Sequence, residues 1–213
     1  MPTRPNPAKR VRHEQPDTLV YVIEDRLYVN LTDRCTLACN FCPKHNGSKE
    51  LHDYNLTLSE RPEQEHIIEQ IGDPSRYQEI VFCGFGEPTL RLKALVSIAT
   101  AVKTKGGRTR LNTDGLANLF HKKNVVPLLA SCIDAMSISL NAQDEQTYTQ
   151  HCAPSLANSH AAALSFIKLA ADMIPDVTAT AIDGLEGVDI IACQKLAKER
   201  GAKFKARALD VVG

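Results

Sequence analysis

Segments typical of β-strands alternate with segments typical of α-helices along most of this 213-residue chain. Short apolar, β-branched or aromatic runs mark the strands, and apolar residues repeated every three or four positions mark the helices. Strands are expected at residues 19–23 and 27–31, as a hairpin or two short strands, and at 79–83, 109–111, 135–140, 176–182 and 203–207, with helices at 62–71, 92–102, 116–129, 157–172 and 189–200. Strands separated by helices pair in parallel through right-handed crossovers. The alternation predicts an α/β fold with a parallel sheet, and it leaves an open doubly wound sheet and a partial barrel as alternatives.

The composition is that of one globular domain. Hydrophobic residues make up 43% of the chain and charged residues 23%, so the chain can bury a core without disulfide bonds. We expect residues 1–18 to form a flexible basic tail, because they carry four of the eleven prolines and a basic run without apolar periodicity. Residues 19–213 are expected to form the domain.

The charge balance argues against partners that are recognised mainly by charge. Lys and Arg together number 25, and Asp and Glu also number 25, so the formal net charge is zero. Such a chain offers no electrostatic support for binding nucleic acid or a membrane surface. Its apolar stretches are too short to cross a bilayer, and its polar start lacks the apolar core of a signal peptide. We therefore expect a cytoplasmic protein with no membrane contact that binds its ligands at a local site.

Three of the seven cysteines lie within eight residues, at Cys35, Cys39 and Cys42. The other four occur singly, at Cys83, Cys132, Cys152 and Cys193. Thiolates are soft ligands that select zinc or iron–sulfur clusters, so this loop predicts a metal centre. Three arrangements are compatible with the spacing: a zinc site completed by His45, a cluster with Cys83 as fourth ligand, or a [4Fe–4S] cluster with three protein ligands and one open iron.

Polar and glycine-rich segments follow the predicted strands at the points where the strands end. The cysteine loop follows strand 27–31, Gly84 to Pro88 follow the next strand, Asn112 to Gly115 the third, and Asn141 the fourth. The carboxyl ends of parallel strands meet at one edge of a sheet or one rim of a barrel, and ligands bind there. These segments are therefore expected to line one site.

The cysteine loop resembles the signature of radical S-adenosylmethionine (SAM) enzymes, which is C-x3-C-x-Φ-C with an aromatic residue such as Phe41 before the last cysteine. The run from Gly84 to Pro88 is similar to the Gly-Gly-Glu-Pro motif of that superfamily, with Phe85 in place of its first glycine. The run from Asn112 to Gly115 is similar to a Thr-Asn-Gly motif, although Asp114 replaces the usual Asn. Three further runs resemble the TatD-associated radical SAM proteins, at residues 82–89, 137–142 and 204–207.

This resemblance, which covers residues 27–207, implies a partial (βα)6 TIM barrel with helices outside a parallel sheet. It also implies two cofactors, a [4Fe–4S] cluster held by Cys35, Cys39 and Cys42, and SAM bound to the open iron. An electron from a donor such as flavodoxin or ferredoxin would cleave SAM to methionine and a 5′-deoxyadenosyl radical. That radical would abstract hydrogen from a substrate that the sequence does not identify, macromolecular substrates included.

The resemblance further assigns residues to SAM binding. Glu87 would accept a charge-assisted hydrogen bond from the SAM ammonium group. Phe41 would pack on the adenine, and Arg207 would pair with the SAM carboxylate or with an anionic substrate. The remaining candidates are the residues at the ends of the second, third and fourth parallel strands, namely Gly84, Gly86, Asn112, Thr113, Ser139 and Asn141. The alternative is a structural or interaction module that binds zinc or an iron–sulfur cluster through the same cysteines plus His45 or Cys83.

Overall fold

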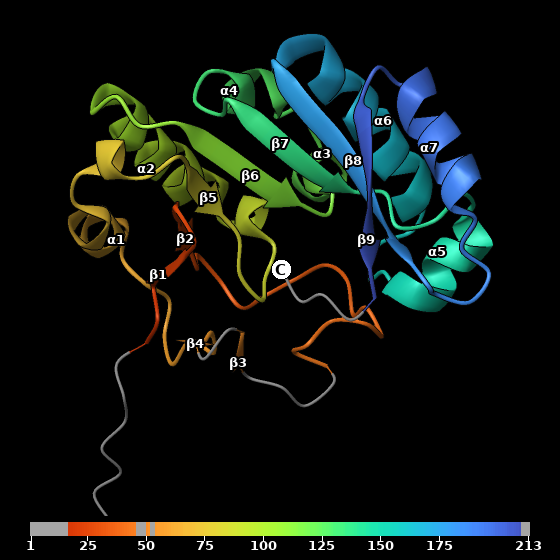
Figure 1. The fold of residues 1–213 in the computed structure, drawn as a ribbon, viewed down its shortest axis with the longest axis horizontal. Helices are drawn as coiled ribbons and strands as arrows, with labels where there is room; N and C mark the ends of the chain where they lie inside the picture. The colour runs from red at the N-terminus through yellow and green to blue at the C-terminus, as the bar shows by residue number, and fades with distance from the viewer. Residues whose placement is uncertain (1–16, 46–49, 52–53, 210–213) are drawn as a thin grey trace, which may run out of the picture.

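The structure, a computed structural model, describes residues 17–45, 50–51 and 54–209. The expected basic tail, residues 1–18, therefore lies outside the described residues except for its last two. One seven-stranded sheet dominates the fold (Figure 1). Its strands are β1 (Val20–Ile23), β2 (Arg26–Val29), β5 (Ile80–Phe82), β6 (Thr109–Thr113), β7 (Ala135–Ser139), β8 (Asp176–Asp183) and β9 (Lys203–Ala208).

The order of the strands distinguishes between the two folds that the sequence left open. The order in the sheet is β1-β2-β5-β6-β7-β8-β9. The strands of this sheet therefore lie side by side in the same order in which they follow one another along the chain. β1 and β2 form an antiparallel hairpin, and every later pair is parallel. A doubly wound sheet reverses its strand order at a switch point, whereas a barrel winds in one direction. Six parallel strands that never reverse therefore form the expected partial barrel.

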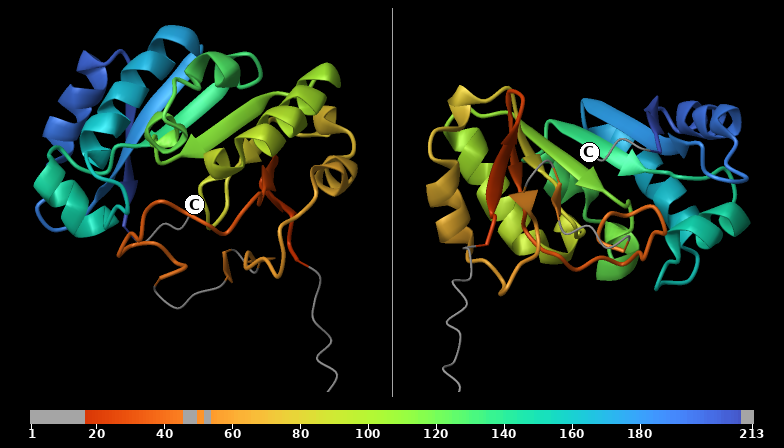
Figure 2. Two further views of the ribbon diagram at one scale, coloured as in Figure 1. Left: turned by 180° about the vertical axis from the view of Figure 1, so that it is seen from behind. Right: turned by 60° about the horizontal axis from the view of Figure 1, so that its bottom comes forward.

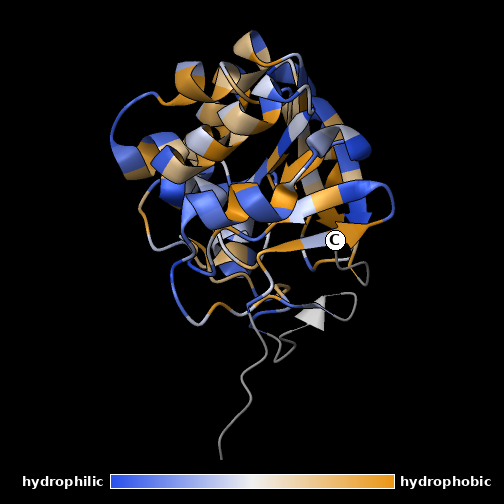
Figure 3. Ribbon diagram, turned by 90° about the vertical axis from the view of Figure 1, so that its left-hand side faces the viewer, coloured by the Kyte–Doolittle hydropathy of each residue, from blue (hydrophilic) through white to orange (hydrophobic). Residues whose placement is uncertain are grey.

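The longer helices cover one face of the sheet (Figure 2), and they carry hydrophobic residues on one side and hydrophilic residues on the other (Figure 3). The helices are α1 (Gln64–Ile71), α2 (Leu92–Thr104), α3 (Ala117–His121), α4 (Val126–Ala130), α5 (Glu145–Cys152), α6 (Ser159–Met173) and α7 (Ile190–Glu199). The main core lies between this layer and the strands, where Phe82 and Leu111 meet Leu95 and Phe166. None of the helices in the described part of the chain combines the length and the apolar character that crossing a bilayer requires.

The two faces of the sheet differ in polarity. In β6, Thr109, Leu111 and Thr113 are buried, whereas Arg110 and Asn112 between them are only half-buried. β7 shows the same alternation toward its end, where Ile138 is buried and Ser139 is half-buried. Successive side chains of a strand point to opposite faces, so the apolar face packs on the helices and the concave face carries the polar residues.

Two expectations about helices were wrong. Residues 116–129 do not form one helix, because α3 ends at His121 and α4 begins at Val126. Lys122 adopts a left-handed conformation (φ 52°), and the Asn118 side chain accepts a hydrogen bond from the Val125 amide (2.8 Å), which stabilises the break. The sequence analysis also missed α5, a mostly polar helix capped by Asp144, and the small β3–β4 hairpin (Glu50–Leu51 with Tyr54–Asn55).

A layer of ion pairs closes the amino-terminal end of the concave face. The buried carboxylate of Glu79 accepts hydrogen bonds from Arg26 Nε (3.1 Å) and Arg110 Nε (2.8 Å). Asp176 of β8 pairs with Lys203 at the start of the adjacent strand β9, and across β7 with Arg110 of β6 and with Arg108 just before it. These pairs tie β2, β6, β8 and β9 together at the end of the barrel opposite the cysteine loop.

We predict that Glu79→Ala lowers the free energy of unfolding by about 1.5–3 kcal/mol, because it leaves two partly buried guanidinium groups without their acceptor. Urea unfolding followed by circular dichroism measures the change. Glu69→Ala is the matched control, since Glu69 is exposed on α1, and it should change the stability by less than about 0.5 kcal/mol. Equal effects of the two substitutions would contradict the assigned role of Glu79.

Candidate functional site

The three clustered cysteines lie on the loop that follows β2, which runs past the carboxyl ends of the central strands to reach α5 (Figure 1). Cys35 is exposed, Cys39 and Cys42 are half-buried, and all three thiols are free. The loop is turned on itself, because the Leu37 amide donates to Cys35 Sγ (3.4 Å) and the Cys42 amide to the Cys39 carbonyl (3.1 Å). The three cysteines therefore lie on one compact loop beside the carboxyl ends of the strands.

The end of α5 holds the cysteine loop in place. The amides of Ala38 and Asn40 donate to the carbonyls of Cys152 and His151, each at 2.9 Å. The Asn40 side chain also meets His151 Nδ1 (3.2 Å), while His151 Nε2 lies 2.7 Å from the Glu186 carbonyl oxygen. A carbonyl oxygen only accepts, so Nε2 carries the proton and Nδ1 accepts from Asn40. His151 thus joins the cysteine loop to the loop that follows β8.

The carboxylate of Glu87 connects two of the segments that were expected to form the site. It is buried and accepts hydrogen bonds from the Thr89 amide (2.9 Å) and hydroxyl (2.7 Å), the Thr113 hydroxyl (2.9 Å) and the Asp114 amide (2.7 Å). The bonds to Thr89 cap the 3₁₀ helix η2 (Pro88–Arg91). Those to Thr113 and Asp114 fix the end of β6. One carboxylate therefore holds the turn before η2 and the turn after β6 beside each other at the rim.

Asp114 extends this network to the cysteine loop. Its carboxylate accepts hydrogen bonds from the Leu116 amide (2.9 Å) and from the hydroxyl of Thr36, which lies beside Cys35. The sequence marks Asp114 only as a departure from the usual Asn, and it gives no sign of a role for Thr36. The two residue types are compatible with this contact, because a buried Asp requires hydrogen-bond donors and a hydroxyl group supplies one.

The electrostatic environment of this network is acidic. Burial, together with the charge of Asp114, raises the pKa of Glu87 to about 8, and burial also raises the pKa of Asp114. Partial desolvation, Asp114 and Glu87 raise the pKa of the Cys35 thiol to about 12. A desolvated pair of carboxyls beside the cysteine loop favours a ligand that brings positive charge.

The two glycines before Glu87 are required by the packing of the chain itself. A Cβ atom on Gly84 would lie 2.4 Å from Asn30 Oδ1, and one on Gly86 would lie 2.2 Å from the Thr32 carbonyl oxygen. The Glu87 amide donates to the Arg34 carbonyl (2.7 Å) at the same contact. The glycine turn therefore packs directly against the segment that leads into the cysteine loop.

A second group of polar side chains lies at the mouth of the barrel around Cys83. The Asn112 amide lies next to the Cys83 thiol, and Arg207 is close enough to Cys83 and Cys39 for their charges to interact. Arg207 Nε, Asn112 Oδ1 and Asn141 Oδ1 are buried, yet none has a hydrogen-bond partner in the described structure. Buried polar atoms are nearly always paired, so these three atoms have hydrogen-bonding capacity left for a polar ligand.

The cysteine nearest to Cys39 outside the loop is Cys152 of α5. A thiol hydrogen bond to Cys152, together with burial, raises the pKa of Cys39, and the Asn141 side chain donates to Cys152 Sγ (3.3 Å). Asn141 adopts a left-handed conformation (φ 62°), which Asn tolerates better than most residues. The sequence analysis placed Cys152 among the isolated cysteines, because α5, the helix that brings it to the loop, has no apolar repeat and was not expected.

The other candidates have simpler surroundings. Phe41 packs against an apolar cluster that contains Leu37, Leu116 and Tyr148. Ser139 lies half-buried at the end of β7, in register with Thr180 of β8. The Thr113 hydroxyl, in addition to its bond to Glu87, accepts a hydrogen bond from the Gly115 amide (3.2 Å). His45 lies on the surface beyond Cys42, where its amide donates to the Cys42 carbonyl (2.9 Å).

The donor set of the loop fits an iron–sulfur cluster in type and number. Over the described ranges, no three His, Cys, Asp or Glu side chains are gathered around the position of a single metal ion. In a [4Fe–4S] cluster each cysteine binds a different iron, so the three thiolates do not have to meet at one point. Three thiolates leave one iron without a protein ligand, and the unpaired polar atoms of Asn112, Asn141 and Arg207 lie near the same rim.

Comparisons with known proteins agree with this site. The family model described as "Radical SAM superfamily" matches residues 29–199. A GTP 3′,8-cyclase from Corynebacterium glutamicum (strain R) is 28% identical over 187 residues, which cover 84% of this chain and 47% of the relative. The chain thus spans about half the length of the curated relative that it matches.

Solved structures with a similar fold include two forms of SuiB from Streptococcus suis. SuiB bound to the precursor peptide SuiA has a TM-score of 0.66 at 16% identity, covering 90% of this chain and 40% of SuiB. SuiB bound to S-adenosylmethionine has a TM-score of 0.66 at 17% identity, covering 88% and 41%. Methylornithine synthase (PylB) has a TM-score of 0.55 at 12% identity, covering 86% and 53%. These likenesses confirm the expected α/β partial barrel.

We predict that the stability of the metal-free protein decreases between about pH 5 and pH 8 in part because of Glu87. Its pKa is higher in the folded protein, so the stabilisation is complete below the ordinary carboxyl pKa and is lost as the pH rises through about 8. Glu87→Gln should make the free energy of unfolding depend less steeply on pH in this window. Urea titrations at several pH values measure the slope, and Glu69→Gln, at an exposed site, should leave it unchanged.

Proposed function

This chain belongs to the radical SAM superfamily, and on that basis we propose that it is an enzyme that binds a [4Fe–4S] cluster and SAM at the rim of its barrel and starts a radical reaction there. Members of this superfamily use both cofactors. The observation that carries the proposal is the position of Cys35, Cys39 and Cys42 beside buried polar atoms that lack partners. We assign the activity to residues 19–213, which include the whole matched region.

Cys35, Cys39 and Cys42 would hold the cluster as thiolates. Since the pKa values of Cys35 and Cys39 are raised in the metal-free protein, these thiols give up protons when iron binds. The hydrogen bonds from α5 and from Thr36 hold the loop in its turned conformation before any metal arrives. What the cluster and SAM supply together is the one-electron cleavage of a carbon–sulfur bond and a carbon radical that abstracts hydrogen.

The residues at the mouth would bind SAM through complementary charges and hydrogen bonds. The guanidinium of Arg207 suits the SAM carboxylate, because its buried Nε has no partner among the residues that the structure describes. The free carbonyl oxygens of Asn112 and Asn141 suit hydroxyl or ammonium donors, with Thr113 and Ser139 beside them on the same strand ends. Phe41 offers its ring to the adenine.

Glu87 would interact with the SAM ammonium while it holds the rim turns together. Its Oε1 atom accepts three hydrogen bonds and its Oε2 atom accepts one, so Oε2 keeps an acceptor position. Asp114, which shares the buried site, adds negative charge to the same side of the rim. Gly84 and Gly86 allow the Glu87 turn to sit this close to the cysteine loop.

The substrate would reach the radical through the open side of the partial barrel. The precursor peptide bound to SuiB is one example of a macromolecule bound to a protein with this fold, and we include macromolecules in the substrate class of this chain. An electron donor such as flavodoxin or ferredoxin would reduce the cluster. Residues 82–89, 137–142 and 204–207 support placing the chain among the TatD-associated radical SAM proteins. Its free thiols suit the reducing cytoplasm, where we place it.

Reconstitution with iron and sulfide under anaerobic conditions tests the proposed cluster. We predict a brown protein with about four irons per chain, and complete loss of the cluster in Cys35→Ala, Cys39→Ala or Cys42→Ala. Cys132→Ala and Cys193→Ala are the matched controls, because both thiols are buried in the main core, and they should keep the full iron content.

A colourless protein that holds stoichiometric zinc and takes up no iron or sulfide would overturn the proposal. It would favour the alternative, a structural module that uses the same cysteines with His45 or Cys83. Release of 5′-deoxyadenosine from the reduced, SAM-loaded protein would distinguish the enzyme from an iron–sulfur module that only has a structural role.

Equilibrium dialysis of SAM under anaerobic conditions tests the role of Arg207. Arg207→Gln should weaken SAM binding by about ten- to a hundredfold while the iron content stays unchanged, since a hydrogen bond between charged groups is lost. Lys205→Gln, at an exposed position two residues away on β9, is the matched control and should change the affinity by less than about twofold. Unchanged SAM binding by Arg207→Gln would contradict the proposed contact between the guanidinium and the SAM carboxylate.

A further inference from the structure

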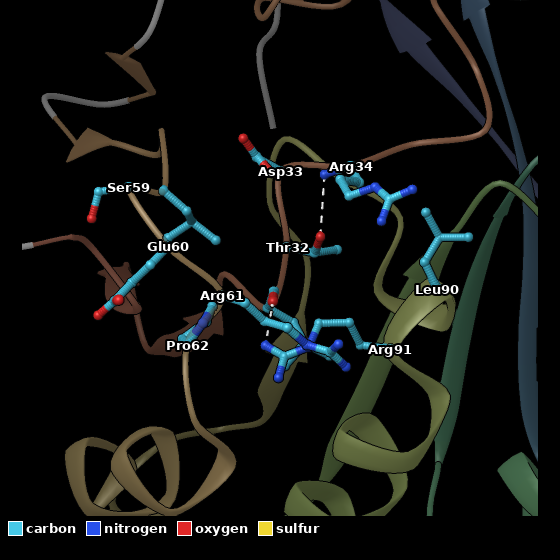
Figure 4. A pocket seen from close by; sticks show the side chains of 11 residues that line it. Thr32, Asp33, Arg34, Ser59, Glu60, Arg61, Pro62, Leu90 and Arg91 are labelled. Carbon is cyan, nitrogen blue, oxygen red and sulfur yellow. Dashed lines mark hydrogen bonds between the residues drawn. The ribbon is translucent and has the colours of Figure 1, made fainter.

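A cavity of about 300 Å³ lies on the outer flank of the cysteine loop (Figure 4). One wall is the segment from Leu31 to Arg34 that leads into the loop, and the others are residues 58–62 before α1 and Arg91 at the end of η2. None of the residues at the barrel mouth, such as Cys83 or Arg207, lines it. Its volume is at the lower end of the range of small-molecule sites.

The cavity gathers arginine side chains from three separate segments, namely Arg34, Arg61 and Arg91. Burial and the neighbouring charge of Arg61 both lower the pKa of Arg91, which shows that the two guanidinium groups are close. Figure 4 shows these two groups side by side at one end of the cavity. Two like charges repel each other, so the arrangement costs free energy unless an anion offsets it.

No carboxylate within the described residues forms an ion pair with any of these three arginines. Asp33 and Glu60 also line the cavity, but their carboxylates point away from the Arg61–Arg91 pair (Figure 4). Glu63 lies near enough to influence Arg91 without pairing with it. Arg91 Nη1 donates to the Leu31 carbonyl (2.9 Å), whereas its buried Nε has no partner in the part of the chain that the structure describes.

We propose that the part of this cavity around Arg61 and Arg91 is a phosphate-binding site, which takes inorganic phosphate or the phosphoryl group of a small metabolite. Phosphate and phosphoryl groups carry about 1.5 to 2 negative charges near neutral pH, which suits two adjacent guanidinium groups. Its oxygens also accept the paired N–H bonds that an arginine fork presents. A chloride ion or a single carboxylate supplies only one charge.

The position of the site links it to the cysteine loop. Arg34 directly precedes Cys35, and its amide donates to the Thr32 hydroxyl (3.2 Å) in the wall of the cavity. The Arg34 carbonyl in turn accepts a hydrogen bond from the Glu87 amide. A phosphate bound at Arg61 and Arg91 would therefore lie against the wall that leads to the first cluster ligand.

Isothermal titration calorimetry of the cluster-loaded protein tests the proposal under anaerobic conditions and at constant ionic strength. Inorganic phosphate is titrated in one arm and ribose 5-phosphate in the other, with ribose as the ligand that lacks the phosphoryl group. We expect saturable binding of phosphate that Arg61→Gln weakens about tenfold or more and Arg61→Lys weakens less. Arg76→Gln, the same change at an exposed arginine on η1 (Pro74–Arg76), should leave the affinity within about twofold.

The two arms also identify the source of the phosphate. Tighter binding of ribose 5-phosphate, with no binding of ribose, supports a phosphorylated metabolite, and tighter binding of inorganic phosphate supports the free ion. Absence of saturable binding in both arms would overturn the proposal, as would equal affinities in the parent and in Arg61→Gln. Because Arg61 is exposed and no cysteine lines the cavity, the iron content serves as a check that the variants are folded and loaded.

Discussion

The buried carboxylate of Glu87 is the group around which the rim of this barrel is organised. Taking a carboxylate out of water costs free energy unless hydrogen bonds satisfy its oxygens. Here four donors from Thr89, Thr113 and Asp114 do so, and each donor belongs to a segment that must therefore take a fixed position. Asp114 in turn accepts a hydrogen bond from Thr36, which fixes the cysteine loop relative to the same network. The geometry of the site thus depends on satisfying one desolvated group.

The two faces of the sheet contribute differently to the protein. The face toward the helices holds the apolar core, and ion pairs around Glu79 and Asp176 close one end of the opposite face. The other end of the concave face carries Asn112 and Arg207, whose buried polar atoms have no partner among the described residues. Unsatisfied buried atoms reduce stability, and those at this end lie where we propose that a cofactor binds.

The segment from Asn30 to Arg34 connects the two sites that we propose. On one side the glycine turn packs against it so closely that no side chain fits between them. On its other side it forms the wall of the arginine-lined cavity. Because Cys35 follows directly, a ligand in that cavity and the cofactors at the rim would act on the same short piece of backbone. This shared wall gives the proposed phosphate site a physical route to the cysteine loop.

Much of the architecture follows from local sequence patterns. The positions of β5, β7 and β8, for example, follow from short apolar runs, because a strand buried on one face shows its character over a few residues. The spacing of Cys35, Cys39 and Cys42 likewise indicates a metal centre, since three thiols on one short loop are neighbours in any fold. The arrangement of the strands as a partial barrel required either the family resemblance or the structure, because periodicity does not specify strand order.

Only the tertiary structure shows what holds the site together. The helix α5 lacks an apolar repeat, so its contacts through His151 and Cys152 with the cysteine loop could not be read from the sequence. The bond between Thr36 and Asp114 joins residues 78 positions apart, and Arg34, Arg61 and Arg91 come from three separate segments. Such contacts are decided by how the strands and helices pack, and a side chain carries no local mark of the partner that packing will give it. The sequence by itself determined which chemical groups are present, and the packing decided which of them meet.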